Sequence, residues 1–169
     1  PVVIRSDASL DEVAALEAEV AVAAEDAGFA SLWLMDHFLQ IPPVGPHWED
    51  MLDSWTTLGF LAGRTSTIRL GTLVTGVTYR NLGHLAKIVA TLDVLSGGRT
   101  RMVACSGGGA GPVWEAESAA MGQDPADRNK RMIDNIHVLR HLWTKDDEPY
   151  ESAFCKFSGI TLEPKPVQD

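Results

Sequence analysis

Short apolar runs alternate along this chain with longer segments of helical character, and this alternation restricts the possible folds more than any other feature. The clearest runs begin near Leu32, Ile68 and Arg101, so the strand–helix unit repeats at roughly 35 residues. The run SLWLM at residues 31–35 shows no polar alternation, as expected for a parallel strand that is covered on both faces. Strands and helices in alternation predict an α/β fold with a parallel sheet.

The same patterns predict where the elements begin and end. Helix N-caps are expected at Ser9 and at Ser54 or Asp53, and Gly28 and the pair Gly97–Gly98 follow predicted helix ends. We expect strands over residues 1–4, 29–35, 67–75 and 100–105, and helices over residues 9–27, 54–64, 82–95, 115–121 and 125–143. Loops cover residues 39–53 and 106–112, a small hairpin covers residues 150–162, and a Pro-containing connector covers residues 163–169.

Four strand–helix units set the size of the expected domain. A complete (β/α)8 barrel has eight such units and typically about 250 residues, so 169 residues suit about half of one. We therefore expect residues 1–169 to form a single partial barrel domain of the TIM-barrel type, with about the first four βα units. A doubly wound sheet of four units is the structural alternative.

Charge and cysteine content argue against several classes of function. The net charge is −9 and no segment concentrates Lys and Arg, so we expect no nucleic-acid partner. No run approaches the roughly 18 apolar residues of a membrane span, and residues 1–11 lack the pattern of a signal peptide. Cys105 and Cys155 form no CxxC pair, which favours a reduced, cytoplasmic setting. His137 and His141 have no third ligand at a recognisable spacing, so no metal site is predicted.

Ligands of parallel α/β folds bind at the carboxyl ends of the strands, and three segments of this chain occupy such ends. Asp36 and His37 directly follow the strand expected at residues 29–35. A carboxylate there can accept hydrogen bonds from a ligand, and an imidazole can exchange protons with a substrate or cofactor near neutral pH. A turn in which Asp36 caps local amides and His37 faces solvent explains the same residues, and both interpretations stay open.

The second strand end is rich in small residues. Thr72, Thr75 and Thr78 interleave with Gly71 and Gly76, an arrangement that would let a flat ring approach the backbone closely. A simpler explanation is that Thr favours strands and Gly marks a bulge. From the pattern alone, this simpler explanation is favoured.

The third strand end is the glycine-rich segment SGGGAGP at residues 106–112. Its amide groups would suit an anion such as phosphate, but it matches neither a P-loop nor a GxGxxG motif, and an ordinary surface loop is the favoured interpretation. Glu115 and Glu117 follow it and offer a general acid, although glutamates in the first turn of a helix need no function. Trp48, in the loop at residues 39–53, is the tryptophan placed where a substrate pocket would use it.

Five segments, in order along the chain, resemble the luciferase-like monooxygenase superfamily. They are AEDAGFASLWLMDHF (residues 24–38), STIRLGTLVTGVTYRN (66–81), LAKIVATLDVLSGGR (85–99), LRHLWT (139–144) and LEPKPVQ (162–168). No single segment is decisive, but five in the right order and at the right spacing are hard to obtain by chance. The resemblance implies a (β/α)8 barrel, with further units after residue 169, and an oxidoreductase that uses FMN or coenzyme F420.

The Asp-His pair and the strand GTLVTGVTYR look most similar to the F420-dependent branch. By that resemblance, Asp36 would contact the deazaflavin, and His37 would be the catalytic residue that faces its reactive carbon and the substrate. The strand around residues 72–76 would lie against one face of the ring, where the family often has a non-proline cis peptide bond. The expected cofactor-binding residues are Asp36, Thr72, Val74, Thr75, Gly76, Ser106 and Gly107, and Trp48 would face the substrate.

Three functional hypotheses remain open. The first is hydride transfer between F420 and a small organic substrate, with His37 as proton donor or acceptor. The second is an FMN-dependent monooxygenase of the same superfamily. The third is a non-catalytic half-barrel that serves as a binding or assembly module. A half-barrel leaves two sheet edges and an uncovered interior, so we expect a homodimer or association with a second half-barrel.

Overall fold

Three parallel strands form the centre of the fold. The computed structural model describes residues 10–124 and 126–168. Its central strands lie in the order β1 (Ser31–Asp36), β2 (Arg69–Gly76) and β3 (Thr100–Cys105). The other elements are α1 (Leu10–Asp26), α2 (Ser54–Ala62), α3 (Leu82–Ser96), α4 (Pro112–Ala120), α5 (Arg128–Thr144) and the hairpin of β4 (Tyr150–Glu151) and β5 (Lys156–Phe157). The expected α/β fold with a parallel sheet is confirmed, while the strand expected at residues 1–4 lies outside the described residues.

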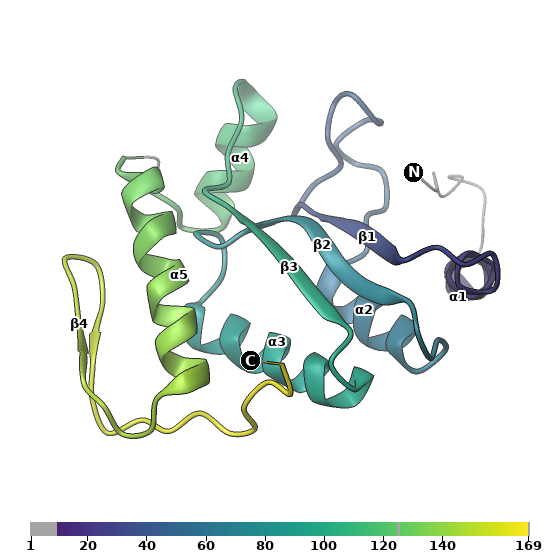
Figure 1. The fold of residues 1–169 in the computed structure, drawn as a ribbon. Helices are drawn as coiled ribbons and strands as arrows, with labels where there is room; N and C mark the ends of the chain where they lie inside the picture. The colour runs from purple at the N-terminus through teal and green to yellow at the C-terminus, as the bar shows by residue number, and fades with distance from the viewer. Residues whose placement is uncertain (1–9, 125, 169) are drawn as a thin grey trace.

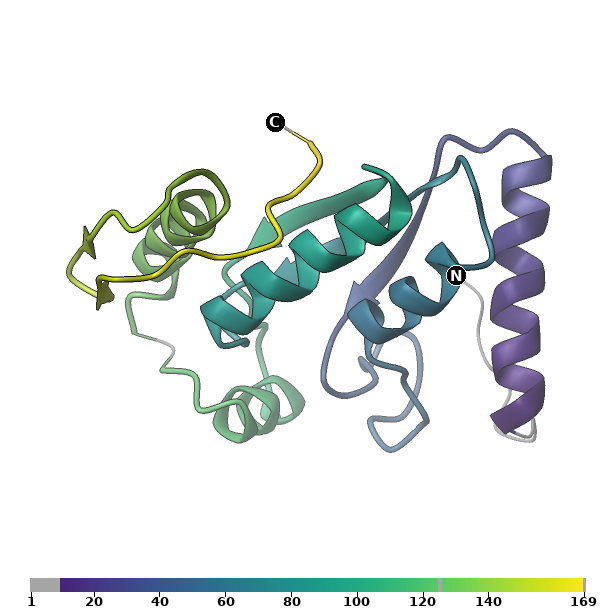
Figure 2. The same ribbon diagram turned by 90° about the horizontal axis from the view of Figure 1, so that it is seen from below.

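Helices α2 and α3 cover one face of this sheet, and α5 runs alongside α3 next to β3 (Figures 1 and 2). Leucines from both layers fill the space between them and are almost completely shielded from solvent: Leu58, Leu61, Leu70, Leu85 and Leu139. Their burial supplies the main apolar stabilisation of the fold. Within the described residues, no helix combines the length and apolar character needed to cross a membrane.

The opposite face of the sheet stays open. Trp33, Leu73 and Val103 alternate along their strands with residues that face the helices, and they are 37%, 54% and 38% exposed. Gly71 lies beside Trp33, and a Cβ at that position would come within 2.7 Å of the indole ring. The Trp33 ring therefore covers the backbone of β2 at Gly71, while the apolar side chains of this face remain partly exposed to water.

Strand β2 bulges near its carboxyl end. The pairing with β3 shifts register between Leu73 and Thr75, and the pairing with β1 shifts between Leu34 and Asp36. The peptide bond Leu73–Val74 is cis, which confirms the prediction of a non-proline cis bond in this segment. The backbone of residues 73–76 consequently leaves the regular pleat where the strand reaches its carboxyl end.

Arg99 fastens the amino-terminal ends of the strands. It follows the left-handed Gly97 and Gly98 that end α3. All five N–H donors of its guanidinium group go to neighbouring segments of the chain, at 2.8 to 3.1 Å: the carbonyl oxygens of Ala62, Thr65, Ile68 and Ser96, and the hydroxyl of Thr65. One side chain thereby joins the end of α2, the start of β2 and the start of β3.

Glu25, near the end of α1, makes a second attachment at the same end of the sheet. Its carboxylate accepts hydrogen bonds from the amide groups of Ser66, Thr67 and Ile68 and from the Thr67 hydroxyl. The amide groups of Ile68 and Thr67 lower the pKa of Glu25 to about 2. Because these amides bond Glu25 and not a neighbouring strand, β2 begins at Arg69, two residues later than predicted.

The carboxy-terminal segment is bound to α3 and to the start of β3. The nearly fully buried carboxylate of Asp93 accepts hydrogen bonds from the amide groups of Val167 and Gln168 and from the Gln168 side chain. Gln168 also donates to the carbonyl oxygen of Thr100, the first residue of β3. The chain thus returns to the amino-terminal end of β3, on the side away from β2 (Figure 1).

Three predicted boundaries need correction. Helix α4 starts at Pro112 and not at residue 115, because proline fits the first turn, where its missing N–H is not needed. Helix α5 starts at Arg128 and not at residue 125, because Asp127 is left-handed, with φ 55°. The hairpin predicted over residues 150–162 has only two residues in each strand.

Candidate active site

The carboxyl ends of β1, β2 and β3 meet at one edge of the sheet, beside α4 and the loop of residues 39–53 (Figure 1). A cavity of about 340 Å³ opens there. We refer to this cavity and the residues around it as the mouth. Its lining residues are Asp36, His37, Phe38, Met51, Asp53, Tyr79, Arg80 and Met121.

Asp36 is buried in the mouth, and its carboxylate binds other residues of this chain. Its carboxylate accepts a hydrogen bond from Ser54 Oγ at 2.7 Å, and the guanidinium of Arg80 approaches it twice, at 2.5 and 3.3 Å. Arg80 also contacts the carboxylate of Asp53 at 2.6 Å. Burial opposes ionisation of Asp53, but hydrogen bonds from Arg80 and Thr56 outweigh it, so the pKa of Asp53 lies below its usual value.

His37 lies next to Glu117, a carboxylate from α4 that is only 1% exposed. The His37 Nδ1 atom lies 3.4 Å from one carboxylate oxygen and 3.5 Å from the other. The same carboxylate accepts hydrogen bonds from the amide of Phe38 at 2.6 Å and from the hydroxyl of Tyr79 at 3.2 Å. The Trp114 ring lies 5.2 Å from the His37 ring, and the imidazole keeps 23% of its surface exposed.

Tyr79 connects the mouth to the glycine-rich segment. Its hydroxyl donates to Glu117 and accepts a hydrogen bond from the amide of Gly108 at 2.5 Å. Burial and the negative charge of Glu117 raise the pKa of Tyr79 to about 12, although the Gly108 amide lowers it. The phenol therefore stays protonated at neutral pH and can donate to the carboxylate.

The glycine-rich segment packs against this tyrosine. Gly107 has a positive φ of 66°, and a Cβ there would lie 2.5 Å from the Tyr79 ring. A Cβ on Gly108 would overlap the guanidinium group of Arg128. The carbonyl oxygen of Ser106 accepts hydrogen bonds from Thr78 at 2.7 Å and from the Gln123 side chain at 3.1 Å. Residues 106–108 are thus hydrogen-bonded to the turn after β2 and to the segment between α4 and α5, and Gly108 lies close to Arg128 at the start of α5.

The threonines of β2 face away from the mouth. Thr72 and Thr75 are completely buried, and their hydroxyl groups hydrogen-bond each other at 2.7 Å. Val74 is half-buried, and a Cβ on Gly76 would lie 2.8 Å from the Tyr79 ring. The two threonine hydroxyls are therefore not available to a ligand at the strand end.

Trp48 lies apart from the mouth. It is 75% exposed, and its ring contacts the ring of His47 at 4.9 Å. Glu115 is also exposed, so the two glutamates of α4 differ sharply in burial. Within the described residues, no group of three or more His, Cys, Asp or Glu side chains could hold a metal ion.

Four polar residues in or beside the cavity were not predicted as site residues from the sequence: Ser54, Asp53, Tyr79 and Arg80. Tyr79 and Arg80 stand directly after the second strand, in the segment GVTYR, and an arginine at a strand end beside Asp36 is a signal that could have been used. Asp53 was considered only as a helix cap. It does cap α2 by accepting the Thr56 amide, and it binds Arg80 in addition.

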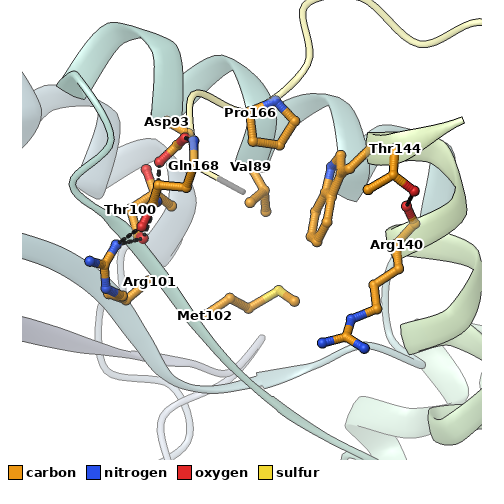
Figure 3. Close-up of a pocket in the computed structure, with 10 residues that line it drawn as sticks. Val89, Asp93, Thr100, Arg101, Met102, Arg140, Thr144, Pro166 and Gln168 are labelled. Carbon is orange, nitrogen blue, oxygen red and sulfur yellow. Dashed lines mark hydrogen bonds between the residues drawn. The ribbon is translucent and has the colours of Figure 1, made fainter.

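A larger cavity of about 830 Å³ lies elsewhere, between α3, α5 and the carboxy-terminal segment (Figure 3). It is mostly apolar, with Val89, Met102 and Pro166 in the middle and Arg101 and Arg140 toward its two sides. It borders the first half of β3, from Thr100 to Met102. This groove therefore lies along the free edge of the sheet and not at the carboxyl ends of the strands.

Comparisons with known proteins give a consistent result. The family described as luciferase-like monooxygenase matches residues 3–169. The F420-dependent glucose-6-phosphate dehydrogenase of Amycolatopsis mediterranei (strain U-32) is 30% identical over 151 residues, which make up 89% of this chain and 44% of that protein. The chain thus spans less than half the length of this curated relative.

Solved structures resemble the fold. Monooxygenase RslO1 from Streptomyces bottropensis aligns with a TM-score of 0.80 at 24% identity, over 99% of this chain and 48% of that one. An F420-dependent secondary alcohol dehydrogenase, solved in complex with an F420–acetone adduct, aligns with a TM-score of 0.74 at 24% identity, over 90% of this chain and 45% of that one. At these identities the similarity establishes the fold and leaves the chemistry to the site itself.

Proposed function

The chain belongs to the luciferase-like monooxygenase family, and from that premise we propose that it forms the cofactor-binding part of an F420-dependent oxidoreductase. The reaction is a hydride transfer between the deazaflavin and a small organic substrate. The relative described above, which matches 89% of this chain, is itself named as F420-dependent. FMN, in a monooxygenase of the same family, is the alternative cofactor.

One observation carries this proposal: a partly exposed imidazole lines the mouth beside the buried carboxylates of Asp36 and Glu117, at the end of the strand that pairs with the bulged end of β2. When bound, the cofactor supplies the hydride chemistry, and the protein supplies orientation and a proton. His37 is the residue suited to give or take that proton, because its ring is open to the mouth on one side. We assign the flat ring to the bulged backbone of residues 73–76, next to Tyr79, whose ring packs against Gly76.

The charges of the mouth also suit such a cofactor. Asp36, Arg80 and Asp53 together carry a formal charge of −1, which favours N–H and hydroxyl donors on a ligand ring. On the opposite side, Ser106 and Gly107 precede Gly108, which lies beside the guanidinium group of Arg128, and this positive charge favours an anionic group. We assign the cofactor ring to the first region and its phosphate-bearing side chain to the second.

The contacts revise the roles of the expected residues. Asp36 is committed to Arg80 and Ser54, so its contribution is to fix the shape and charge of the mouth. Thr72 and Thr75 support the bulge from beneath, and Val74 and Gly76 offer their backbone to the ring. Trp48 reaches a substrate only if the loop that carries it moves.

We extend the proposal to the architecture: the chain is a single partial (β/α)8 barrel domain. Its open sheet face and the groove beside β3 are the surfaces that further strands would cover. They come from a second copy, a second half-barrel or additional units of the same polypeptide. A non-catalytic assembly module shares these surfaces but needs no mouth. Both cysteines are free thiols, in keeping with a cytoplasmic setting.

Titration with F420 and, separately, with FMN tests the proposal, with intrinsic tryptophan fluorescence as the signal. We expect saturable quenching by F420 and a loss of affinity of about tenfold, or about 1.4 kcal/mol, in His37→Ala. The matched control is His84→Ala, which removes an exposed histidine from the start of α3.

Each outcome has a meaning. If FMN quenches the fluorescence and F420 does not, FMN is the cofactor. If both histidine substitutions lower the affinity equally, His37 is not part of the cofactor site. No response to either cofactor, at any protein concentration, contradicts the proposal for this chain and favours the assembly module.

A further inference from the structure

Glu117 is a buried carboxylate that pairs with no Lys or Arg among the residues that the structure describes. Within the described part of the chain, His37 is its sole ion-pair partner, and the carboxylate is 1% exposed. It is stabilised by donors: the amides of Phe38 and Leu39 on one oxygen, and the hydroxyl of Tyr79 on the other. All of these groups donate, so both oxygens of the Glu117 carboxylate act as hydrogen-bond acceptors.

This arrangement determines where the proton of His37 lies. An ionised carboxylate can only accept, so the contact between Nδ1 and Glu117 at 3.4 to 3.5 Å requires a hydrogen on Nδ1. In the neutral ring, Nε2 then carries the free electron pair. No described residue hydrogen-bonds Nε2, and this nitrogen remains available at the mouth.

The other charged groups near His37 are already balanced. Asp36, its neighbour in sequence, is paired with Arg80, which also neutralises part of Asp53. Tyr79 stays protonated, because burial and Glu117 raise its pKa to about 12. Trp114 contributes a neutral ring. Glu117 is therefore the one uncompensated charge among the described groups that contact the imidazole.

We propose that Glu117 is a positioning residue that fixes His37 in the Nδ1–H tautomer and leaves Nε2 as the nitrogen that exchanges protons. When Nε2 takes up a proton, the imidazolium faces Glu117 and the pair becomes neutral. Glu117 also joins three strand ends, since it binds the amide after His37 and, through Tyr79, the amide of Gly108. The proton exchange assigned to Nε2 rests on the proposed function, whereas the tautomer itself is a property of the chain that can be measured without a cofactor.

Nitrogen-15 chemical shifts of the histidine rings measure this tautomer in the full chain, with His37→Asn to assign its signals. We expect the Nδ1–H form in the wild type at neutral pH. Glu117→Gln keeps the size of the side chain but presents an amide that can donate toward Nδ1. It should shift the tautomer ratio toward Nε2–H by at least about tenfold, equivalent to about 1.4 kcal/mol. Glu115→Gln, an exposed change on the same helix, should leave the ratio unchanged.

A wild-type Nε2–H ring overturns the inference, even if Glu117→Gln fails to fold. So does a tautomer ratio that is the same in Glu117→Gln and in the wild type. A purely structural role for Glu117 would alter stability without moving the ratio. The cofactor titration is an independent test. If the His37 ring carries its hydrogen on Nδ1 but the chain binds neither F420 nor FMN, this inference stands and the proposed function is wrong.

Discussion

The two ends of the sheet use charged residues in opposite ways. At the amino-terminal end, Arg99 and Glu25 direct their hydrogen bonds to nearby backbone and hydroxyl groups, leaving no donor of the guanidinium unused. At the carboxyl end, His37 keeps an open nitrogen and Arg80 lies between two carboxylates at the edge of a cavity. Polar residues at the amino-terminal end complete the fold, whereas those at the carboxyl end keep hydrogen-bonding groups open to a ligand.

Arg99→Ala should have the largest effect, and on stability alone. It leaves carbonyl oxygens from three segments without donors, and each such buried group costs about 1–3 kcal/mol, so we expect a loss of at least about 3 kcal/mol. Urea unfolding measures the loss. Arg69→Ala, an exposed arginine at the start of β2, is the control and should change stability by less than about 0.5 kcal/mol. A loss of less than about 1 kcal/mol in Arg99→Ala would show that water replaces the guanidinium group and that the amino-terminal end of the sheet is open to solvent.

Arg80→Ala should reduce stability less than Arg99→Ala does, but it should reduce the affinity for F420 more. It leaves Asp36 buried with Ser54 as its remaining donor, next to the negative charge of Asp53. Because the Arg80 side chain is partly exposed, water can compensate in part, and we expect a loss of about 1–3 kcal/mol. The affinity for F420, measured by fluorescence quenching, should fall more in Arg80→Ala than in Arg99→Ala when both variants are compared at the same fraction of folded protein.

The conservative change Arg80→Lys sharpens this prediction. Lysine retains the charge but cannot make the two-point contact with Asp36, so its affinity should lie between those of the wild type and Arg80→Ala. If Arg80→Ala unfolds as completely as Arg99→Ala and a folded Arg80→Lys binds normally, the two ends do not differ in the way described.

Glu25→Gln should have the smallest effect, and one that depends on pH. The folded pKa of about 2 lies below the ordinary value of 4.5, so the carboxylate stabilises the fold fully above about pH 4.5. This contribution is lost as the pH falls toward 2. We expect Glu25→Gln to lose about 1 kcal/mol at pH 7, as for other lost caps of backbone amides. The difference from the wild type should shrink in unfolding curves between pH 4.5 and pH 2; a constant difference would refute the assigned hydrogen bonds.

Local patterns predicted the elements because their signals lie within a few residues. The stop at Gly97–Gly98 is a left-handed helix end, and Asp53 caps α2. The sequence also predicted that the three strand ends lie together, because the carboxyl ends of parallel strands meet at one edge of a sheet. Even so, alternation could have shown that Thr72 shares a face with the buried Leu70, and thus points to the helices.

The partnerships inside the mouth could not be predicted in this way. Glu117 and His37 are 80 residues apart in sequence, and Arg80 and Asp36 are 44 apart. Which charges meet depends on the register of the strands and on where α4 begins, and neither is encoded in a local pattern. Trp48 illustrates the converse, since a suitable position in a loop did not bring its side chain to the cavity.

The open sheet face makes protein concentration a variable in each of these measurements. Trp33, Leu73 and Val103 present apolar surface that an association through this face would bury. By mass action, a partner that binds the folded chain raises its apparent stability as the concentration rises. Melting points and affinities therefore need to be extrapolated to infinite dilution. Trp33 is itself a fluorophore on that face, and its emission should move to shorter wavelength when the surface is covered.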